Sequence, residues 1–147
     1  MAYTVGEAAK ILDVSTSTLR YYESEGLLPT LGRTDGGQRL FEDQEIGACR
    51  VIACLKQSGL SIKDIKRFMD MAVAGDETLA DRLALFQRQR EATLAQIADL
   101  QQVLAMLDFK CWYYQTAVDA GTEDVVRDLP DGAIPAQHRA ARARLDG

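Results

Sequence analysis

The sequence lacks most of the features that mark exported, membrane-spanning or catalytic proteins. No hydrophobic stretch approaches the roughly 18 apolar residues of a membrane helix. The first residues, MAYTVGEAAK, contain neither the basic nor the apolar region of a secretory signal, so we expect a cytoplasmic protein. The chain has one histidine, no Ser-His-Asp or Cys-His constellation and no glycine loop that cradles phosphate. We therefore expect that it is not an enzyme.

Cysteine is also scarce. The three cysteines, Cys49, Cys54 and Cys111, are an odd number in a chain without an export signal, which indicates free thiols rather than a disulfide framework. A thiolate metal site needs at least two convergent ligands, and an iron–sulfur cluster needs about four thiolates. Near the end of the chain only Cys111 and His138 are available. We therefore expect no metal site and no cofactor.

An excess of positive charge is missing as well. The net charge of the 147 residues is -5, which argues mildly against nucleic acid as a partner because phosphate contact usually needs a basic surface. The charge is unevenly distributed, with 9 Lys and Arg against 10 Asp and Glu in residues 1–71, and 8 against 12 in residues 72–147. The first half is nearly neutral, so a local face of it can still be positive.

Two short helices are predicted at the start of the chain. Thr4 and Glu7 form a capping box before an apolar helical pattern that ends at Leu12. Ser15 can cap a second helix, TSTLRYYESE, which stops at Gly26. Two short helices joined by a tight turn predict a helix-turn-helix.

The next segment predicts a small β-hairpin, or wing. Asp35-Gly36-Gly37 is a strong hairpin turn signal, and the flanks 31–33 and 38–41 are long enough for two short strands. Beyond the wing, Asp43 can cap a third helix that ends before Gly59, and Ser61 with Asp64 opens a fourth.

From Leu79 to Tyr114 the pattern changes to a heptad repeat. Apolar residues recur at alternating steps of four and three, interrupted by Arg90 and Thr93, as in a coiled coil. A helix of this length, roughly 55 Å, with a one-sided apolar stripe needs a partner. The simplest partner is a second copy of the chain; the alternative is that the helix packs on its own domain. We define the predicted dimer seam as Leu83, Phe86, Ile97, Leu100, Leu104, Leu107 and Cys111.

These elements together resemble the MerR family of transcriptional regulators. The resemblance covers residues 3–114 and is carried by LRYYESEGLL, then GGQRLF, then SGLSIKDI, in that order. It implies an all-α fold with a small β-wing. A winged helix-turn-helix domain (1–75) would be followed by an antiparallel coiled-coil dimerisation helix (76–115) and a short packed tail (116–147). The family implies a homodimer that binds a promoter palindrome with an overlong spacer and twists the DNA so that RNA polymerase can engage.

The predicted contacts with double-stranded DNA lie on the second helix and the wing. Residues near the start of a recognition helix read bases and anchor to phosphates, and arginine suits both tasks. By helical spacing Tyr21 faces the DNA, whereas Tyr22 shares a face with Leu19, which favours packing. The wing keeps an aromatic ring at Phe41 but lacks the tyrosines common in the family. The candidate DNA-binding residues are Thr16, Ser17, Thr18, Arg20, Tyr21, Tyr22, Arg33, Gln38, Arg39 and Lys56.

The sequence leaves alternatives open for the role of Cys54, for the aromatic cluster and for the binding partner. Cys54, in ACLKQSGLSI, resembles the cysteine of the branch linked to aldehydes and other thiol-reactive electrophiles, and nearby Lys56 and Arg50 favour a thiolate; alternatively it is a core residue. The aromatic cluster 109–114 either lines a small pocket or, as we prefer, docks the helix end on the partner's DNA-binding domain. The acidic charge leaves a second function possible, a coiled-coil adaptor whose winged module binds a protein.

Overall fold

A computed structural model describes residues 1–28, 32–33 and 35–146. The chain divides into two compact units, Met1–Arg90 and Glu91–Gly147. Among the described residues, no helix combines the length and the apolar character needed to cross a membrane.

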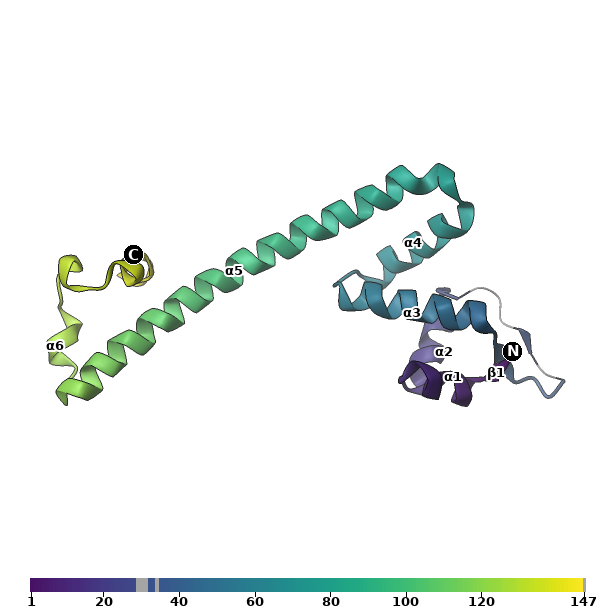
Figure 1. Cartoon of the computed structure of the whole chain (residues 1–147), viewed down its shortest axis with the longest axis horizontal. Helices are drawn as coiled ribbons and strands as arrows, with labels where there is room; N and C mark the ends of the chain where they lie inside the picture. Colours follow the sequence, from purple (N-terminus) through teal and green to yellow (C-terminus); the bar gives the residue numbers. More distant parts are fainter. Residues whose placement is uncertain (29–31, 34, 147) are drawn as a thin grey trace. The chain divides into compact units, whose positions relative to one another are not determined.

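The first unit begins with the expected pair of short helices, α1 (Val5–Leu12) and α2 (Thr16–Ser24) (Figure 1). The capping box is present, because the Glu7 amide donates to Thr4 Oγ1 at 3.3 Å and the Thr4 amide donates to Glu7 Oε2 at 2.8 Å. Asp13, with φ 53°, ends α1 and turns the chain toward α2. The prediction of a helix-turn-helix is confirmed.

A three-stranded antiparallel sheet contains the wing. Its strands are β1 (Tyr3–Thr4), β2 (Gly32–Arg33) and β3 (Arg39–Phe41), in the order β1-β3-β2. The predicted hairpin is present, its register pairs Arg33 with Arg39, and Leu31 lies outside the described residues. The pairing of β1 with β3 was not predicted, because a two-residue strand is too short to show a periodic pattern.

Two further helices complete the domain, α3 (Asp43–Gln57) and α4 (Ile62–Ala74). Ser61 caps α4 as predicted, since its Oγ accepts from the Asp64 amide at 3.1 Å. The predicted cap of α3 is wrong by one residue: Glu42 occupies the cap position, and Asp43 is already helical. The Glu42 amide donates to Glu45 Oε2 at 2.9 Å, so a reciprocal pair of glutamates replaces the expected Asp cap.

The core of this unit draws on every helix and on the wing. The side chains that are essentially inaccessible include Leu19 of α2, Phe41 of β3, Ile52 of α3 and Ile65 of α4. Burial of each large apolar side chain contributes about 1.5–3 kcal/mol. Leu85, from the following helix, belongs to the same core, so the helix-turn-helix and wing rest on one continuous apolar cluster.

The long helix is α5 (Leu79–Ala120), preceded by the 3-10 turn η1 (Asp76–Thr78). Thr78 fixes its start, because Oγ1 donates to the carbonyls of Met71 and Gly75 at 2.7 and 2.8 Å. The helix continues beyond Tyr114, where the predicted heptads end, and stops at Gly121, whose φ is 76°. The long helix is confirmed, whereas the functional boundaries 1–75, 76–115 and 116–147 stay predictions.

The second unit consists of the end of α5 and a tail folded against it. The tail contains α6 (Asp124–Arg127), the 3-10 turns η2 (Asp131–Ala133) and η3 (Ala136–His138), and α7 (Arg139–Asp146). Phe109 of α5, Ile134 and Ala141 form a small core, and Arg142 donates to the carbonyl of Leu129. The expected packed tail is present.

Candidate nucleic-acid interface

The first turn of α2 carries a cluster of short hydroxyl side chains. Ser15 Oγ accepts from the Thr18 amide at 3.1 Å, and it also shares hydrogen bonds with Ser17 Oγ (2.9 Å) and Thr18 Oγ1 (2.8 Å). Ser17 is exposed, and Thr16 and Thr18 are half-buried. Short side chains at a helix start allow a close approach to a groove, and the helix N-terminus favours phosphate.

The two faces of α2 separate as the helical spacing predicted. Leu19 and Tyr22 point into the core, with Tyr22 only 3% exposed, whereas Tyr21 is 41% exposed and Arg20 is exposed. Desolvation by burial, with a smaller contribution from Cys49, raises the pKa of Tyr22 above its ordinary value. The packing role of Tyr22 is confirmed, and a contact between its hydroxyl and DNA stays a prediction.

The wing is tied to the recognition helix by an ion pair. Arg39 Nε of β3 contacts Glu23 Oε2 near the end of α2, and both side chains are partly buried. Gln38 is exposed beside it. Arg33 has its backbone in β2, and its side chain lies outside the part of the chain that the structure describes. The ion pair holds Arg39 at a fixed place next to α2.

Three of the predicted residues surround one polar cavity of about 400 Å³. Arg20 enters from α2 and Gln38 and Arg39 from the wing, while the opposite wall is the start of α1. The residues that line it are Thr4, Val5, Gly6, Arg20, Gly37, Gln38 and Arg39. Two arginines and the start of α1 line it, and the guanidinium of Arg39 is also paired with Glu23. Arginine side chains and the amide end of a helix are groups suited to a phosphate.

Further cations lie on α3 and α4. The ammonium of Lys56 lies 6.0 Å from the centre of the Tyr22 ring, so this predicted DNA contact also forms a cation–π interaction. The sequence analysis did not include Lys63, Lys66 and Arg67 among the candidate DNA contacts, and these residues line one hollow on α4. Their spacing in IKDIKR, three and four residues apart, was the signal that could have found them. Lys66 pairs with Asp70 at 3.3 Å.

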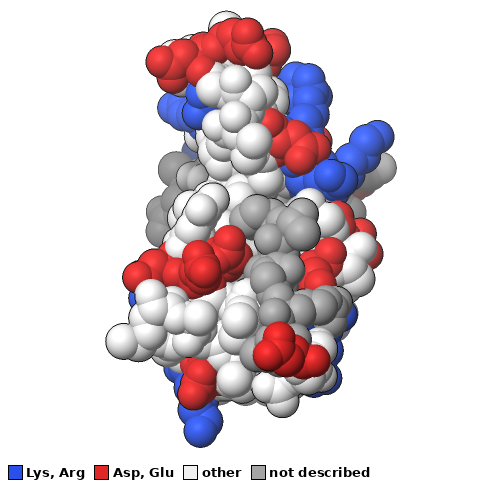
Figure 2. Space-filling model, turned by 90° about the vertical axis from the view of Figure 1, so that its right-hand side faces the viewer, with Lys and Arg blue, Asp and Glu red and all other residues white. Residues whose placement is uncertain are grey.

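Charges of both signs are interspersed on the molecular surface. Figure 2 shows one face, on which red acidic groups and blue basic groups lie close to each other. A negative net charge of the whole chain therefore does not exclude a local site lined by Arg20 and Arg39.

The cysteines of α3 differ sharply in environment. Cys49 is buried, and burial together with the charge of Glu45 raises its pKa to about 11. Cys54 is exposed and lines an apolar cavity of about 270 Å³ with Leu12, Leu19 and Arg50. The alternative that Cys54 is a core residue is wrong, because its position on α3 faces outward.

The aromatic cluster at the end of α5 is covered by the chain's own tail. Phe109, Trp112 and Tyr113 pack against Leu129 and Ile134. The His138 ring is buried, 6.1 Å from Phe109 and 5.7 Å from Trp112. These three aromatic side chains serve mainly the internal packing of the second unit. Docking on a partner stays a prediction for Tyr114, which is exposed.

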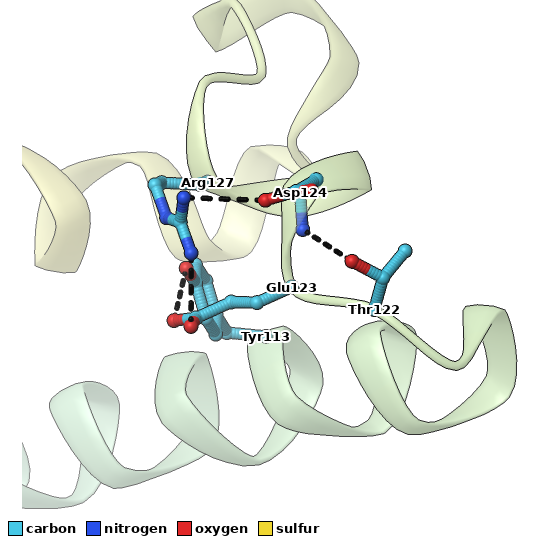
Figure 3. A network of polar contacts seen from close by, with 5 residues as sticks. All are labelled: Tyr113, Thr122, Glu123, Asp124 and Arg127. Atoms are coloured by element: carbon cyan, nitrogen blue, oxygen red, sulfur yellow. Dashed lines mark hydrogen bonds and ion pairs between the residues drawn. The ribbon is translucent and has the colours of Figure 1, made fainter.

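A polar network fastens the tail to α5 (Figure 3). The Tyr113 hydroxyl donates to Glu123 Oε1 at 2.8 Å, and Arg127 contacts Glu123 at 3.3 Å and Asp124 at 3.2 Å. The hydrogen bonds from Tyr113 and Arg127 lower the pKa of Glu123. The hydrogen bond between Tyr113 and Glu123 also raises the pKa of Tyr113.

The helix-turn-helix, the paired wing and the cationic cavity between them define a winged helix-turn-helix protein of the DNA-binding class. Two family models agree with this class. The model for the MerR HTH family regulatory protein matches residues 3–72, and the model described as MerR, DNA binding, matches residues 49–108.

Known proteins resemble the chain over most of its length. An uncharacterized HTH-type transcriptional regulator of Haemophilus influenzae is 42% identical over 130 residues, 88% of this chain and 96% of the relative. The crystal structure of HiNmlR, a MerR family regulator lacking the sensor domain and bound to promoter DNA, is 42% identical with a TM-score of 0.69, covering 88% and 98% of the two chains. A MerR family regulator from Bacillus thuringiensis is 36% identical with a TM-score of 0.60, covering 76% and 97%.

The chain therefore belongs to the MerR family of helix-turn-helix regulatory proteins. It is a DNA-binding transcriptional regulator, as the sequence motifs predicted.

Proposed function

We propose that the chain acts as a homodimer that binds a promoter palindrome, with one α2 helix in each of two major grooves and the wings on the flanking backbone. The observation that carries this is the common exposed face of α2 and the wing: Arg20, Gln38 and Arg39 surround one polar cavity, and Tyr21 is exposed beside Arg20. HiNmlR, similar over 88% of this chain, is bound to promoter DNA. Arg20 is suited to bases or phosphates, and Gln38 and Arg39 to the backbone.

The dimer is supported by the unpaired apolar stripe on α5. Leu100, Leu104 and Leu107 are 67%, 57% and 55% exposed although the tail folds against the same helix. Phe109, which the tail covers, is nine positions from Leu100 and therefore about 180° around the helix. The core contact of the tail at Phe109 thus lies opposite Leu100, and Arg144 of α7 lines a hollow together with the seam residue Leu107. The exposed leucines of the seam can therefore pack against a second copy.

The distribution of charge along α5 favours the antiparallel orientation. Residues 79–98 contain three Arg and two acidic residues, whereas residues 99–120 contain one Lys and three Asp. An antiparallel pair places the more basic half of each helix against the more acidic half of the other, whereas a parallel pair places like halves together.

On this basis the dimer would distort its operator and act with RNA polymerase, as the family resemblance implies. Lys63, Lys66 and Arg67 of α4 add to the candidate phosphate contacts. A protein that bends or twists DNA reads deformability as well as bases, and it needs backbone contacts outside the major groove to hold the distorted duplex.

DNase footprinting on the chain's upstream region, repeated over a range of salt concentrations, tests the proposal. We expect a protected palindrome and an affinity that falls steeply with salt, because several phosphates are neutralised. Arg20→Ala should reduce the affinity by about 1–3 kcal/mol if Arg20 reads a base, whereas Arg88→Ala on exposed α5 is the matched control. A folded dimer that protects no DNA at low salt, yet binds a protein in a salt-insensitive way, would establish the adaptor function instead.

A second candidate function is the sensing of aldehydes or other thiol-reactive electrophiles by Cys54. The observation that favours it is the exposure of Cys54 in the apolar cavity beside Arg50, in contrast to buried Cys49. Cys54→Ser should abolish the transcriptional response to an aldehyde without weakening operator binding, whereas Cys111→Ser, the matched exposed thiol, should leave it unchanged. A normal aldehyde response in Cys54→Ser would refute the role of this thiol.

A further inference from the structure

Several contacts fasten the beginning of α5 to the DNA-binding domain. Nearest its start, an Arg82 guanidinium nitrogen donates to the carbonyl of Gly75 at 3.0 Å. Leu85 is buried in the domain core, and the Phe86 ring meets the Phe68 ring edge-on at a centroid distance of 5.3 Å. One turn later, Gln89 Nε2 donates to the main-chain carbonyl of Ser58 at 2.9 Å. The contacts of Leu85 and Phe86 are apolar and tolerate sliding, whereas the hydrogen bond of Gln89 has a preferred direction.

The acceptor of this bond lies at the end of α3, in the turn that leads to α4. The amide and the hydroxyl of Ser58 both donate to the carbonyl of Cys54, at 3.0 and 2.9 Å. Ser58 is the C-terminal cap of α3, and carbonyls at the end of a helix lack intrahelical donors. Gln89 supplies such a donor from a residue 31 positions away in the sequence.

Gly59 makes the close approach possible. Its φ of 88° belongs to the left-handed region, and a Cβ at this position would lie 2.9 Å from Gln89 Nε2. Any other residue would combine backbone strain with displacement of the Gln89 amide. The sequence Ser58-Gly59 is therefore shaped for contact with α5 as well as for ending α3.

We propose that Gln89 is a positioning residue that sets the direction in which α5 leaves the DNA-binding domain, and thereby sets the spacing between half-sites that the dimer accepts. The inference rests on the proposed function, because it requires a dimer joined through α5. In such a dimer each recognition helix is connected to the seam only through the α5 attachment. A change of direction at Gln89 would shift the separation of the two α2 helices, which must match the half-site spacing.

The same bond also links α5 with the helix that carries Cys54. Cys54 is four residues before Ser58 on α3, and its carbonyl accepts both hydrogen bonds of Ser58. A displacement of the last turn of α3 would therefore move the Ser58 carbonyl, and with it the acceptor of the Gln89 hydrogen bond on α5.

The test measures binding to duplexes that carry two inverted half-sites, recovered from a random duplex library, with spacers varied one base pair at a time. Wild type should prefer one spacer. Gln89→Glu is isosteric but lacks the donor, and it should lower the discrimination between neighbouring spacers by about threefold to tenfold, the size of one net hydrogen bond. Gln89→Lys keeps a donor and should restore the preference. Gln87→Glu, an exposed glutamine in the same turn region, is the matched charge control.

The outcomes separate this inference from the proposed function. A uniform loss of affinity at every spacer, or a spacer profile of Gln89→Glu equal to that of Gln87→Glu, overturns the role of Gln89 and leaves the dimeric regulator intact. Failure of wild type to bind any duplex of the series overturns the proposed function itself. Relaxed spacing in Gln89→Glu with recovery in Gln89→Lys supports the inference, because a loss of folding alone would not alter the ratio between spacers.

Discussion

The two units of the chain solve the problem of apolar burial differently. Met1–Arg90 encloses thirteen buried residues in one cluster fed by all of its helices and by the wing. Among the described residues, the apolar cluster of Glu91–Gly147 has only three buried members, namely Phe109, Ile134 and Ala141, and a row of leucines on α5 is open to solvent. The first unit has a core of the kind that supports an independently folded domain, whereas the second leaves much of its apolar surface exposed.

This difference gives each unit one kind of exposed surface, a polar face on α2 and an apolar row on α5. In the first unit Leu19 and Tyr22 of α2 are buried in the core, so the outer face of α2 can make polar contacts with DNA. In the second unit the tail covers the side of α5 around Phe109, and Leu100, Leu104 and Leu107 of the proposed seam stay exposed. Folding of one unit and association through the other should therefore respond to different substitutions.

The largest expected effect comes from placing a charge in the seam. Leu100→Asp puts two carboxylates in the interface of a homodimer, where they would be desolvated without a partner. We expect monomers and an operator affinity lower by about 100-fold or more, because the two half-sites are no longer bound together. Sedimentation velocity and gel shifts measure the two effects.

The control for this substitution is Ala98→Asp, an exposed position about 160° around α5 from Leu100. It should leave both the dimer and the DNA affinity unchanged. If Leu100→Asp remained a dimer, the seam would be located elsewhere, and the comparison between the two units would lose its basis.

A core substitution in the first unit should have the next largest effect. Ile65 is fully buried on α4, and Ile65→Ala should lower the free energy of unfolding by about 2–5 kcal/mol, measured by urea denaturation. Val73→Ala on the same helix changes a side chain that is 88% exposed and should cost less than about 0.5 kcal/mol. Equal effects at both positions would contradict the core described above.

The sequence predicted the first unit better than the second because its local signals were strong. Ser15, Ser61 and the Asp35-Gly36 turn each specify a cap or a hairpin through contacts only a few residues apart. The Glu42 cap was missed because glutamate is an uncommon cap residue and Asp43 offered a more usual one. The ion pair between Glu23 and Arg39 joins residues distant in sequence, so no local pattern announced it.

In the second unit the heptads identified α5 but not what covers its other side. Periodicity showed that the seam residues share a face, and their exposure agrees with that reading. It could not show that Phe109 and Trp112 meet His138 and Ile134, because the tail returns through short turns without a periodic pattern. The preferred docking of the aromatic cluster on a partner was therefore based on only half of its surroundings.

The reactivity of the three thiols should follow their burial, and their effect on stability should be smaller than that of Ile65→Ala. At pH 8 iodoacetamide should alkylate exposed Cys54 and Cys111 readily and Cys49 slowly, because burial and the Glu45 charge keep the pKa of Cys49 near 11. Mass spectrometry of peptides from the native protein measures the order. Since the raised pKa favours the protonated thiol in the folded state, its stabilising contribution is present below the pKa of the unfolded thiol and is lost as pH rises toward about 11. Rapid labelling of Cys49 would show that α3 opens in the first unit.

The smallest expected effect is an acid-induced loosening of the tail in the second unit. Hydrogen bonds from Tyr113 and Arg127 hold the pKa of Glu123 below its ordinary value of 4.5, so the folded state favours the carboxylate. That contribution is present above the ordinary value and disappears as pH falls through the lowered pKa of the folded state. Trp112, the one tryptophan of the chain, packs against the small core, and its fluorescence reports this change.

Glu123→Gln keeps the shape of the side chain but removes the titrating group, so the acid transition in Trp112 fluorescence should weaken or vanish below about pH 4.5. Asp119→Asn, which changes an acidic residue in the last turn of α5 that bonds Gln115 instead, is the matched control and should retain the transition. Because Glu123 is partly exposed, the change should be modest and should shrink in high salt, as expected for a screened ion pair. An unchanged transition in Glu123→Gln would mean that the apolar contacts of Phe109 and Ile134 alone hold the tail, and the polar network in Figure 3 would then follow the packing rather than support it.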